Sequence, residues 1–291
     1  MSLTDQIKKQ VELKTGEIII SAHQVGGGSI SEAYKISTAS GRNLFLKINT
    51  YVPDDMFTKE KNGLNELHKS GSIKTPEVLL VDSSFILLEF ISSAVVSKKS
   101  FDDFGKRFAL LHKYSGNSFG FYEDNYIGST AQINIADEDE LKDWKIFYYN
   151  KRILFQYKLA EKNGYASKEL TEAIIKLENK MDYILSGSYE KPSLLHGDLW
   201  SGNFIIDESG NACLIDPAVY YGNREADLAM TKLFGGFPSR FYESYNEVYP
   251  LKDGYDYREN LYKLYHVMNH LNLFGMSYYS QAISLLNYYL K

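Results

Sequence analysis

The sequence predicts an α+β fold with two lobes: a small, antiparallel, β-rich N-terminal lobe and a larger, mainly helical C-terminal lobe. Three observations support this prediction. Strand-like segments surround one helix in the first ninety residues, a small polar stretch follows, and amphipathic helices fill most of the remainder. We expect the two lobes to span residues 1–91 and 92–291.

The N-terminal lobe is expected to contain two hairpins and one helix. The segments before and after Thr-Ala-Ser-Gly-Arg flank a turn-rich spacer, as the strands of a hairpin do. Leu64 and Leu67 fall on one face of the helix, which ends before Ser70 and Gly71. The expected strands are 17–23, 33–37, 44–48, 76–81 and 85–90, and the expected helix is 58–69.

The C-terminal lobe follows a linker of small and polar residues at 92–99. Apolar residues then recur at spacings of three and four, which is typical of amphipathic helices. Residues 115–139 indicate a long loop, and strand patterns return only around a Glu-Ser-Gly-Asn turn. The expected helices are 101–114, 140–161, 168–185, 261–273 and 278–290, and the expected strands are 204–207 and 212–216.

Composition excludes several classes of protein. The 291 residues are 44% hydrophobic, so the chain can bury a core and is not a disordered protein. The net charge of −5 argues against a nucleic-acid partner, because such binding needs a basic surface. The chain has one cysteine, no run of about 18 apolar residues and no apolar signal core, which favours a cytoplasmic protein without a membrane partner.

The strongest functional motif is His-Gly-Asp-Leu-Trp-Ser-Gly-Asn at 196–203, followed by Asp216 at the end of an expected strand. Asp198 and Asn203 are five residues apart, as in the catalytic loop of kinases. Asp198 can orient the attacking hydroxyl and receive its proton. Asn203 and Asp216 offer the hard oxygen ligands that Mg²⁺ needs on the phosphates of ATP. The alternative is a surface loop with an ordinary Asx turn.

Gly26, Gly27, Gly28 and Ser29 form a glycine-rich loop between two expected strands. Glycines allow backbone N–H groups to approach phosphate oxygens closely. The loop is not a Walker A loop, because no Gly-Lys-Ser/Thr follows and the next element is a strand. It resembles the hairpin loop that covers nucleotide phosphates in kinases; a flexible turn is the alternative.

Lys47 lies among apolar residues of an expected strand and must either reach water or meet an anion. Its place one hairpin after the glycine loop is that of the lysine that pairs with the α- and β-phosphates in kinases. We expect a helix carboxylate beside it, with Glu60 preferred over Glu66. Solvent-facing positions are the alternative for both Lys47 and Glu60.

Two further positions complete the predicted nucleotide site. Glu89, Phe90 and Ile91 end the last strand before the linker, where the hinge of a kinase binds the adenine edge through backbone groups. Asp227 begins a predicted helix and could accept N–H bonds from the catalytic loop, which would brace its shape. An acid favoured by the helix dipole is the alternative for Asp227.

Together these segments resemble the fructosamine kinase (ketosamine-3-kinase) family. That family belongs to the wider group of aminoglycoside and choline kinase-like phosphotransferases, which have a protein-kinase-like fold. The resemblance covers nearly the whole chain, and its most specific motifs are HGDLWSGN at 196–203, DPAVYYG at 216–222 and NHLNLFG at 269–275.

The resemblance implies ATP-dependent phosphorylation of the O3 hydroxyl of a ketosamine, with ATP and Mg²⁺ as cofactors. The substrate would be a small-molecule or protein-bound ketosamine, and its phosphorylation begins deglycation. Carried over by motif, Asp198 is the catalytic base, Asn203 and Asp216 are the Mg²⁺ ligands, and Lys47 with Glu60 positions the phosphates. Monomer and homodimer both remain open.

Two positions depart from the family pattern. Ser29 stands where eukaryotic relatives often have cysteine, so a redox switch through that loop is not expected. Tyr122 and Glu123 stand where many members have a proline, so this loop is expected to bend differently.

Sugar recognition is less marked in the sequence. Trp200, beside the catalytic loop, is a candidate for stacking on the sugar ring, with a packing role as the alternative. Asp124 and Asn125 are candidates for bonds to sugar hydroxyls, and a turn role is the alternative. His266 and His270 on a late helix suggest core or pocket-wall residues rather than metal ligands.

Two other functions remain as alternatives. An aminoglycoside- or choline-type kinase would use the same chemistry on a cationic substrate. A nucleotide-binding pseudokinase would lack at least one catalytic group, whereas this chain has Lys47, Asp198, Asn203 and Asp216 together.

Overall fold

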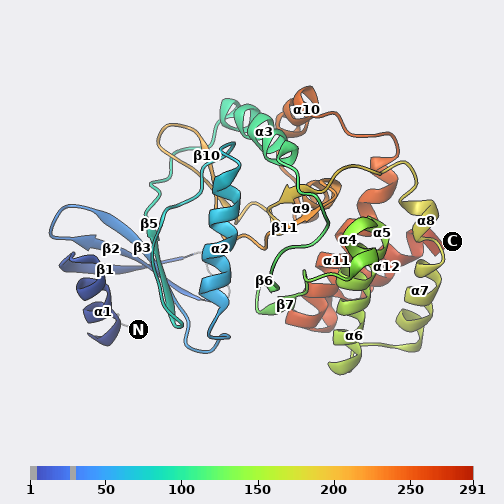
Figure 1. The fold of residues 1–291 in the computed structure, drawn as a ribbon, viewed down its shortest axis with the longest axis horizontal. Helices are drawn as coiled ribbons and strands as arrows, with labels where there is room; N and C mark the ends of the chain where they lie inside the picture. The colour runs from blue at the N-terminus through green and yellow to red at the C-terminus, as the bar shows by residue number, and fades with distance from the viewer. Residues whose placement is uncertain (1–4, 27–30, 291) are drawn as a thin grey trace.

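The computed structural model describes residues 5–26 and 31–290 (Figure 1). A five-stranded antiparallel sheet comes first, and a larger, mainly helical region follows it. The predicted α+β fold class is therefore confirmed. Within the described ranges, no helix combines the length and the apolar character needed to cross a bilayer.

The sheet lies between two helices that cover its opposite faces (Figure 1). Successive side chains of a strand point to opposite faces, so the faces have separate clusters. Leu46 packs with Val11 of the first helix on one face, and Leu88 packs with Phe57 of the second on the other. In sheet order the strands are β1 (Ile19–Val25), β2 (Glu32–Thr38), β3 (Asn43–Ile48), β5 (Phe85–Glu89) and β4 (Val78–Val81), and the helices are α1 (Asp5–Thr15) and α2 (Met56–Lys69).

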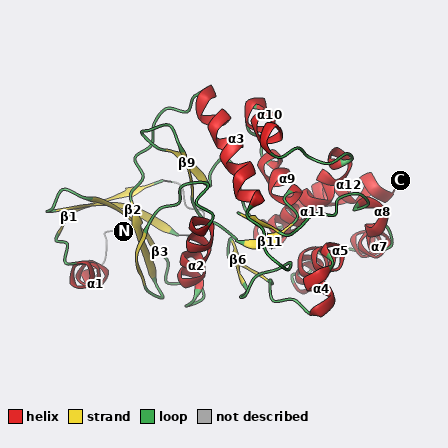
Figure 2. Cartoon of the chain, turned by 45° about the horizontal axis from the view of Figure 1, so that its top comes forward, coloured by secondary structure: helices red, strands yellow, loops and turns green. Residues whose placement is uncertain are grey.

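The helical region also contains three short antiparallel strand pairs, some of which Figure 2 shows between the sheet and the helices. These pairs are β6 (Asn125–Ile127) with β7 (Thr130–Gln132), β8 (Ser193–Leu195) with β11 (Tyr220–Gly222), and β9 (Phe204–Ile206) with β10 (Ala212–Leu214). The helices are α3 (Lys98–Lys113), α4 (Glu138–Lys142), α5 (Trp144–Tyr148), the π-helix η1 (Tyr149–Leu154), α6 (Phe155–Lys162), α7 (Lys168–Glu178), α8 (Met181–Ile184), α9 (Glu225–Leu233), α10 (Ser239–Val248), α11 (Tyr255–Phe274), the 3₁₀ turn η2 (Met276–Tyr278) and α12 (Tyr279–Leu290).

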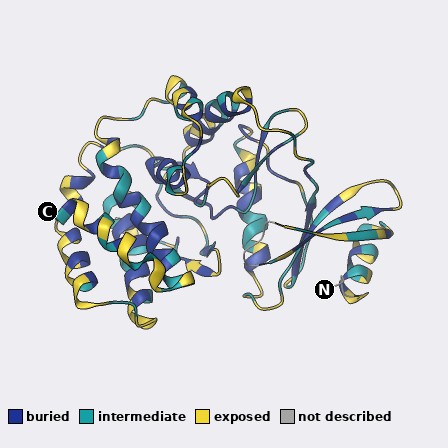
Figure 3. Ribbon diagram, turned by 180° about the vertical axis from the view of Figure 1, so that it is seen from behind, coloured by how far each residue is buried: buried dark blue, intermediate teal, exposed yellow. Residues whose placement is uncertain are grey.

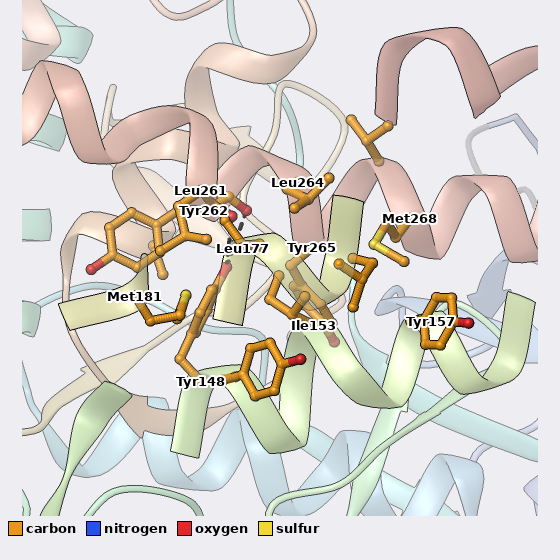
Figure 4. Close-up of a cluster of buried hydrophobic side chains, with 14 of the residues drawn as sticks. Tyr148, Ile153, Tyr157, Leu177, Met181, Leu261, Tyr262, Leu264, Tyr265 and Met268 are labelled. Atoms are coloured by element: carbon orange, nitrogen blue, oxygen red, sulfur yellow. Dashed lines mark hydrogen bonds between the residues drawn. The ribbon is translucent and has the colours of Figure 1, made fainter. Parts of the chain in front are cut away.

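The largest hydrophobic core surrounds α11 (Figure 4). Tyrosines supply much of this core, and their hydroxyl groups find partners inside it. Tyr148 donates to the backbone carbonyl of Tyr262 at 3.2 Å, and Tyr289 donates to the carbonyl of Tyr257 at 2.7 Å. Such bonds allow a polar tip to be buried at little cost, because the hydroxyl exchanges water for a protein acceptor.

The outer helices are amphipathic, with buried residues on one side and exposed residues on the other (Figure 3). In α7, residues Leu170, Ala173, Ile174 and Leu177 are buried, at the spacing of one helix face. Ser167 begins this helix by accepting the backbone N–H of Leu170 at 3.1 Å. The apolar spacing and the Ser167 cap both indicate a helix that begins at Lys168, which explains why the sequence predicts it.

Several local predictions are wrong. The expected helix 140–161 is interrupted after α4, because Asp143 accepts the backbone N–H of Lys145 at 2.8 Å and starts a new helix; α5, η1 and α6 then follow one another without a gap. The expected loop 115–139 contains the β6–β7 hairpin and part of α4. Helix α1 was not expected, since its polar sequence buries only Ile7 and Val11.

Cys213, the one cysteine of the chain, is fully buried in β10. Burial raises the pKa of its thiol to about 12. The side chain therefore serves as a small hydrophobic core residue.

Candidate active site

A cavity of about 150 Å³ lies where α2, β3, the β6–β7 hairpin and the 196–203 loop meet. The predicted catalytic and phosphate-binding side chains gather there. Its lining includes Lys47, Glu60, Asp198, Trp200, Asn203 and Asp216.

Lys47 joins two carboxylates that are far apart in sequence. Its Nζ donates to both carboxylate oxygens of Glu60, at 2.8 and 2.9 Å, and to Oδ1 of Asp216 at 2.9 Å. Burial lowers the pKa of Lys47, but the nearby Asp216 and Glu60 carboxylates outweigh burial and hold the pKa above its ordinary value. The lysine is therefore charged. The competing candidate, Glu66, instead accepts from Lys69 and Tyr221.

The 196–203 loop begins with a turn that requires glycine. Gly197 has φ of +83°, and a Cβ there would lie 1.9 Å from the carbonyl oxygen of Ala218. The turn directs Asp198 into the cavity. The Nδ2 of Asn203 donates to the backbone carbonyl of Asp198 at 2.8 Å and to its Oδ2 at 3.1 Å.

The carboxyl group of Asp198 is suited to accept a proton. Burial, with a further contribution from the nearby Asp216, raises its pKa well above the usual range for aspartate. A raised pKa makes the carboxylate a stronger base, which is the property that general-base catalysis uses.

Asp227 stabilises the turn at Gly197 through hydrogen bonds to the backbone. It accepts the backbone N–H of His196 at 2.7 Å and that of Gly197 at 2.8 Å. His112, from α3, lies 3.2 Å from the same carboxylate, and its other ring nitrogen lies 2.7 Å from the hydroxyl of Tyr245. Two backbone donors on one buried carboxylate fix the loop conformation. Sequence reasoning missed His112, whose partner is 115 positions away.

Asp216 follows β10 with φ of +54°, the single positive φ of a non-glycine residue in the described ranges. This strained conformation turns its carboxylate toward the cavity. One oxygen accepts from Lys47, while 39% of the side chain stays exposed.

The donor set fits Mg²⁺ held between protein and phosphates. The amide nitrogen of Asn203 is bonded to Asp198, which leaves its oxygen as the group that can bind a cation. No group of three or more His, Cys, Asp or Glu side chains able to hold a metal occurs in the described part of the chain. Mg²⁺ commonly needs only one or two protein oxygens when substrate phosphates supply the rest.

The glycine loop lies mostly outside the described residues. Gly27, Gly28 and Ser29 are among the residues not described, and Gly26, which follows the end of β1, is the last described residue before them. Ser31, on the other side, lines the cavity. The phosphate-binding role of this loop stays a prediction.

The expected hinge residues lie where β5 leaves the sheet. Glu89 donates its backbone N–H to Glu77 at 2.9 Å, and its carboxylate accepts from Lys74 at 3.1 Å. Phe90 has the Nζ of Lys35 4.6 Å from its ring centre, and Ile91 is buried. Their binding to adenine stays a prediction.

The three proposed sugar contacts differ in their surroundings. Trp200 lines the cavity, is 37% exposed and meets Phe234 edge to face at 5.9 Å. Asp124 accepts the backbone N–H groups of Asn134 and Ile135, at 2.7 and 2.9 Å.

Asn125 is buried, and it donates to the carbonyl of Val219 at 2.8 Å while accepting from Gln132 and Asn134. The bonds of Asp124 favour its turn alternative, whereas Asn125 also lines the cavity, and its contact with the sugar stays a prediction. Sequence reasoning did not include Met56, Phe57, Tyr126 and Gly128, which also line the cavity.

The late-helix histidines sit in aromatic surroundings. The ring of His270 lies 5.2 Å from Phe234 and 5.1 Å from Tyr278. His266 is buried against Tyr265, and its Nδ1 has no hydrogen-bond partner within the described residues.

A lysine–glutamate pair at a small sheet, facing an Asp-x-x-x-x-Asn loop and an acid after the next hairpin, places the chain among phosphotransferases with a protein-kinase-like fold. The fructosamine kinase family model matches residues 3–291, and the chain therefore belongs to the fructosamine kinase family.

Individual relatives agree. A probable ketoamine kinase of Vibrio parahaemolyticus is 39% identical, covering 91% of this chain and 90% of its own. A chloroplastic protein-ribulosamine 3-kinase of Oryza sativa subsp. indica is 38% identical, covering 94% of this chain and 80% of its own. The crystal structure of a fructosamine-3-kinase homologue from Thermobifida fusca superposes with a TM-score of 0.90 at 30% identity, covering 99% of each chain.

A more distant structure shares the fold alone. An aminoglycoside phosphotransferase, solved as a ternary complex with ADP and hygromycin B, gives a TM-score of 0.63 at 14% identity and covers 97% of each chain. The family match makes the chain a kinase, and the shared fold confirms the predicted protein-kinase-like fold.

Proposed function

We propose that this chain transfers the γ-phosphoryl group of ATP to the 3-hydroxyl of a ketosamine derived from fructose or ribulose. The observation that carries this proposal is the meeting of Lys47, Asp198, Asn203 and Asp216 around one cavity in a chain of this family. The ribulosamine 3-kinase at 38% identity supports the choice of hydroxyl.

Asp198 acts as the general base. It accepts a hydrogen bond from the attacking hydroxyl, orients that oxygen toward the phosphoryl group and takes its proton. Lys47, held by Glu60, binds phosphate oxygens and keeps the nucleotide in line for attack. Asp227 acts through the backbone, because it fixes the turn that carries Asp198.

Asn203 and Asp216 would hold Mg²⁺. When bound, the ion supplies positive charge that neutralises the phosphate oxygens during transfer. The bond from Asn203 to Asp198 couples the orientation of the amide oxygen to the position of the base.

The two regions divide the work. In this proposal an N-terminal lobe, residues 1–91, binds ATP through the loop at Gly26–Ser29, through Lys47 and through the hinge at Glu89–Ile91. A C-terminal lobe, residues 92–291, carries the catalytic loop and the ketosamine. Trp200, which lines the cavity, stacks a face of its ring on the sugar, since the faces of aromatic rings bind the apolar faces of sugars.

Phosphate transfer from labelled ATP tests the reaction. The acceptors are a fructosamine, a ribulosamine, an aminoglycoside and choline, and the modified hydroxyl of each product is mapped. We expect transfer to the 3-hydroxyl of a ketosamine. Transfer only to the aminoglycoside or to choline would overturn the proposal.

The role of Asp198 has its own test. Asp198→Asn should lower kcat by about 10²–10⁴-fold, because the amide cannot take the proton, while ATP binding remains. Asp182→Asn is the control, since that carboxylate is 84% exposed on α8. A folded Asp198→Asn enzyme with turnover within about threefold of wild type would contradict the assignment.

A further inference from the structure

We propose that Glu123 is a positioning residue for phosphoryl transfer. Its side chain fastens α2 to the helical region and thereby holds Glu60 against Lys47. The inference rests on the proposed roles of Glu60 and Lys47 and extends them to a residue outside the nucleotide pocket.

Both carboxylate oxygens of Glu123 bind α2. Oε2 accepts from the Nζ of Lys59 at 2.8 Å, and Oε1 accepts from the Nδ2 of Asn62 at 2.9 Å. The two donors flank Glu60 in sequence, and they lie three residues apart on one face of the helix. The side chains of Lys59 and Glu123 are only 20% and 15% exposed, so solvent weakens this ion pair less than one on the open surface.

The backbone beneath Glu123 is anchored in the helical region. Its carbonyl accepts from the Nδ2 of Asn134 at 3.3 Å. Asn134 is fully buried and accepts in turn from the guanidinium of Arg152 at 2.7 Å. Asp124, the next residue, accepts two backbone N–H groups of the same loop. The backbone at Glu123 is therefore held in place by the helical region.

Helix α2 touches the helical region on both sides of this contact. The hydroxyl of Tyr126 donates to Asp55, just before the helix, at 2.7 Å, and that of Tyr221 donates to Glu66 at 2.8 Å. At Gly63, a Cβ would lie 3.3 Å from the side chain of Pro217, which follows Asp216. Glu123 is bonded in the middle of this contact, beside the residue that pairs with Lys47.

Loss of this contact should change alignment more than folding. The sheet face of α2 is buried through Phe57 and Leu64, which pack in one hydrophobic cluster with Ile86 and Leu88 of the sheet. Without the Glu123 contact, α2 would keep only the contacts on either side of it and would hold Glu60 and Asp216 less firmly on the same lysine. Small misalignments of reacting groups cost large factors in rate.

The test compares Glu123→Gln with Glu138→Gln, which removes a carboxylate from an exposed ion pair on α4 with Lys142. We expect Glu123→Gln to lower kcat by about tenfold, with the KM for ketosamine and the melting temperature nearly unchanged. We also expect faster hydrogen exchange across residues 56–69. Glu138→Gln should behave as wild type in every measurement.

A double-mutant cycle with Asn62→Leu tests whether Glu123 acts through its bond to α2; Lys59, the other donor, lines the cavity and is left unchanged. If the pair acts together, the second substitution adds little to the first, and the effects on kcat are not additive. Additive effects, or unchanged kcat and unchanged exchange in Glu123→Gln, would overturn the inference.

The exchange measurement needs no turnover. If wild-type protein transferred no phosphate to any acceptor, the proposed function would fail, while exchange in α2 would still decide whether Glu123 fastens this helix.

Discussion

Gly197 shows how one backbone position decides the geometry of Asp198, the proposed base. With φ of +83° and a Cβ that would meet the carbonyl of Ala218 at 1.9 Å, no other residue fits without moving the chain. Gly187 provides a comparison, since it has φ of +76° with open space around it.

The pair of glycines yields a matched prediction. Gly187→Ala should lower the free energy of unfolding by about 1 kcal/mol, the cost of holding alanine at positive φ. Gly197→Ala should lower it by about 3 kcal/mol or more, because its Cβ also clashes with Ala218, and should abolish nearly all activity. Urea unfolding measures both variants. Equal losses would show that the close approach to Ala218 does not constrain the loop.

His266 makes stability depend on pH. Burial lowers its pKa to about 3, whereas the unfolded chain has the ordinary value of about 6.5. Between these two values the unfolded state binds a proton that the folded state does not, so the free energy of unfolding falls as pH falls. One such group contributes a slope of up to about 1.4 kcal/mol per pH unit.

Unfolding by urea at pH 6.5, 5.5 and 4.5 (roughly spanning the window) should show this slope. His266→Gln should make the dependence shallower, and His23→Gln, at an exposed position of β1, should leave it unchanged. His270, whose pKa burial lowers to about 4, contributes in the same direction and remains in all variants. A slope unaffected by His266→Gln would contradict the prediction.

At the scale of elements, α1 shows what a short buried stripe contributes. Val11 is fully buried against the sheet, while Leu13 on the opposite side is 86% exposed. Val11→Ala should cost about 2 kcal/mol of unfolding free energy through lost burial and a cavity. Leu13→Ala should change it by less than about 0.5 kcal/mol. Equal effects in urea unfolding would mean that α1 does not stabilise the sheet.

Sequence patterns predicted the elements whose signals are local. Helix α7 has both a cap and a regular apolar face, and the strands of the N-terminal sheet alternate between its two faces. Strands β8 and β11 have three residues each, and their paired residues are 25 to 29 positions apart, so no short window of sequence contains their pattern. Helix α1 was missed because two apolar residues in eleven give a weak period.

In the candidate site, too, the residues with local sequence signals were predicted and those with long-range contacts were not. Spacing within one loop predicted Asp198 and Asn203, and strand position predicted Lys47. The contacts of Glu123 and His112 join residues more than 60 positions apart, and only the folded chain brings them together. The family resemblance supplied the substrate class, which no spacing of residues could indicate.

At the scale of the whole molecule, ATP with Mg²⁺ should bind both regions at once and stabilise the native state. A nonhydrolysable ATP analogue at about 100 times its Kd adds about 2.7 kcal/mol, seen as a higher melting temperature. We expect the shift to shrink when EDTA removes Mg²⁺ and in Asp216→Asn, which keeps a residue tolerant of positive φ. An EDTA-insensitive shift would contradict the assignment of Asn203 and Asp216.

The buried thiol of Cys213 gives the molecule a single internal reporter. Because the chain has no second cysteine and this one is inaccessible in the native state, a maleimide can react only when β10 separates from its neighbours. The rate of that labelling thus measures how often the core around β10 opens, with no engineered probe.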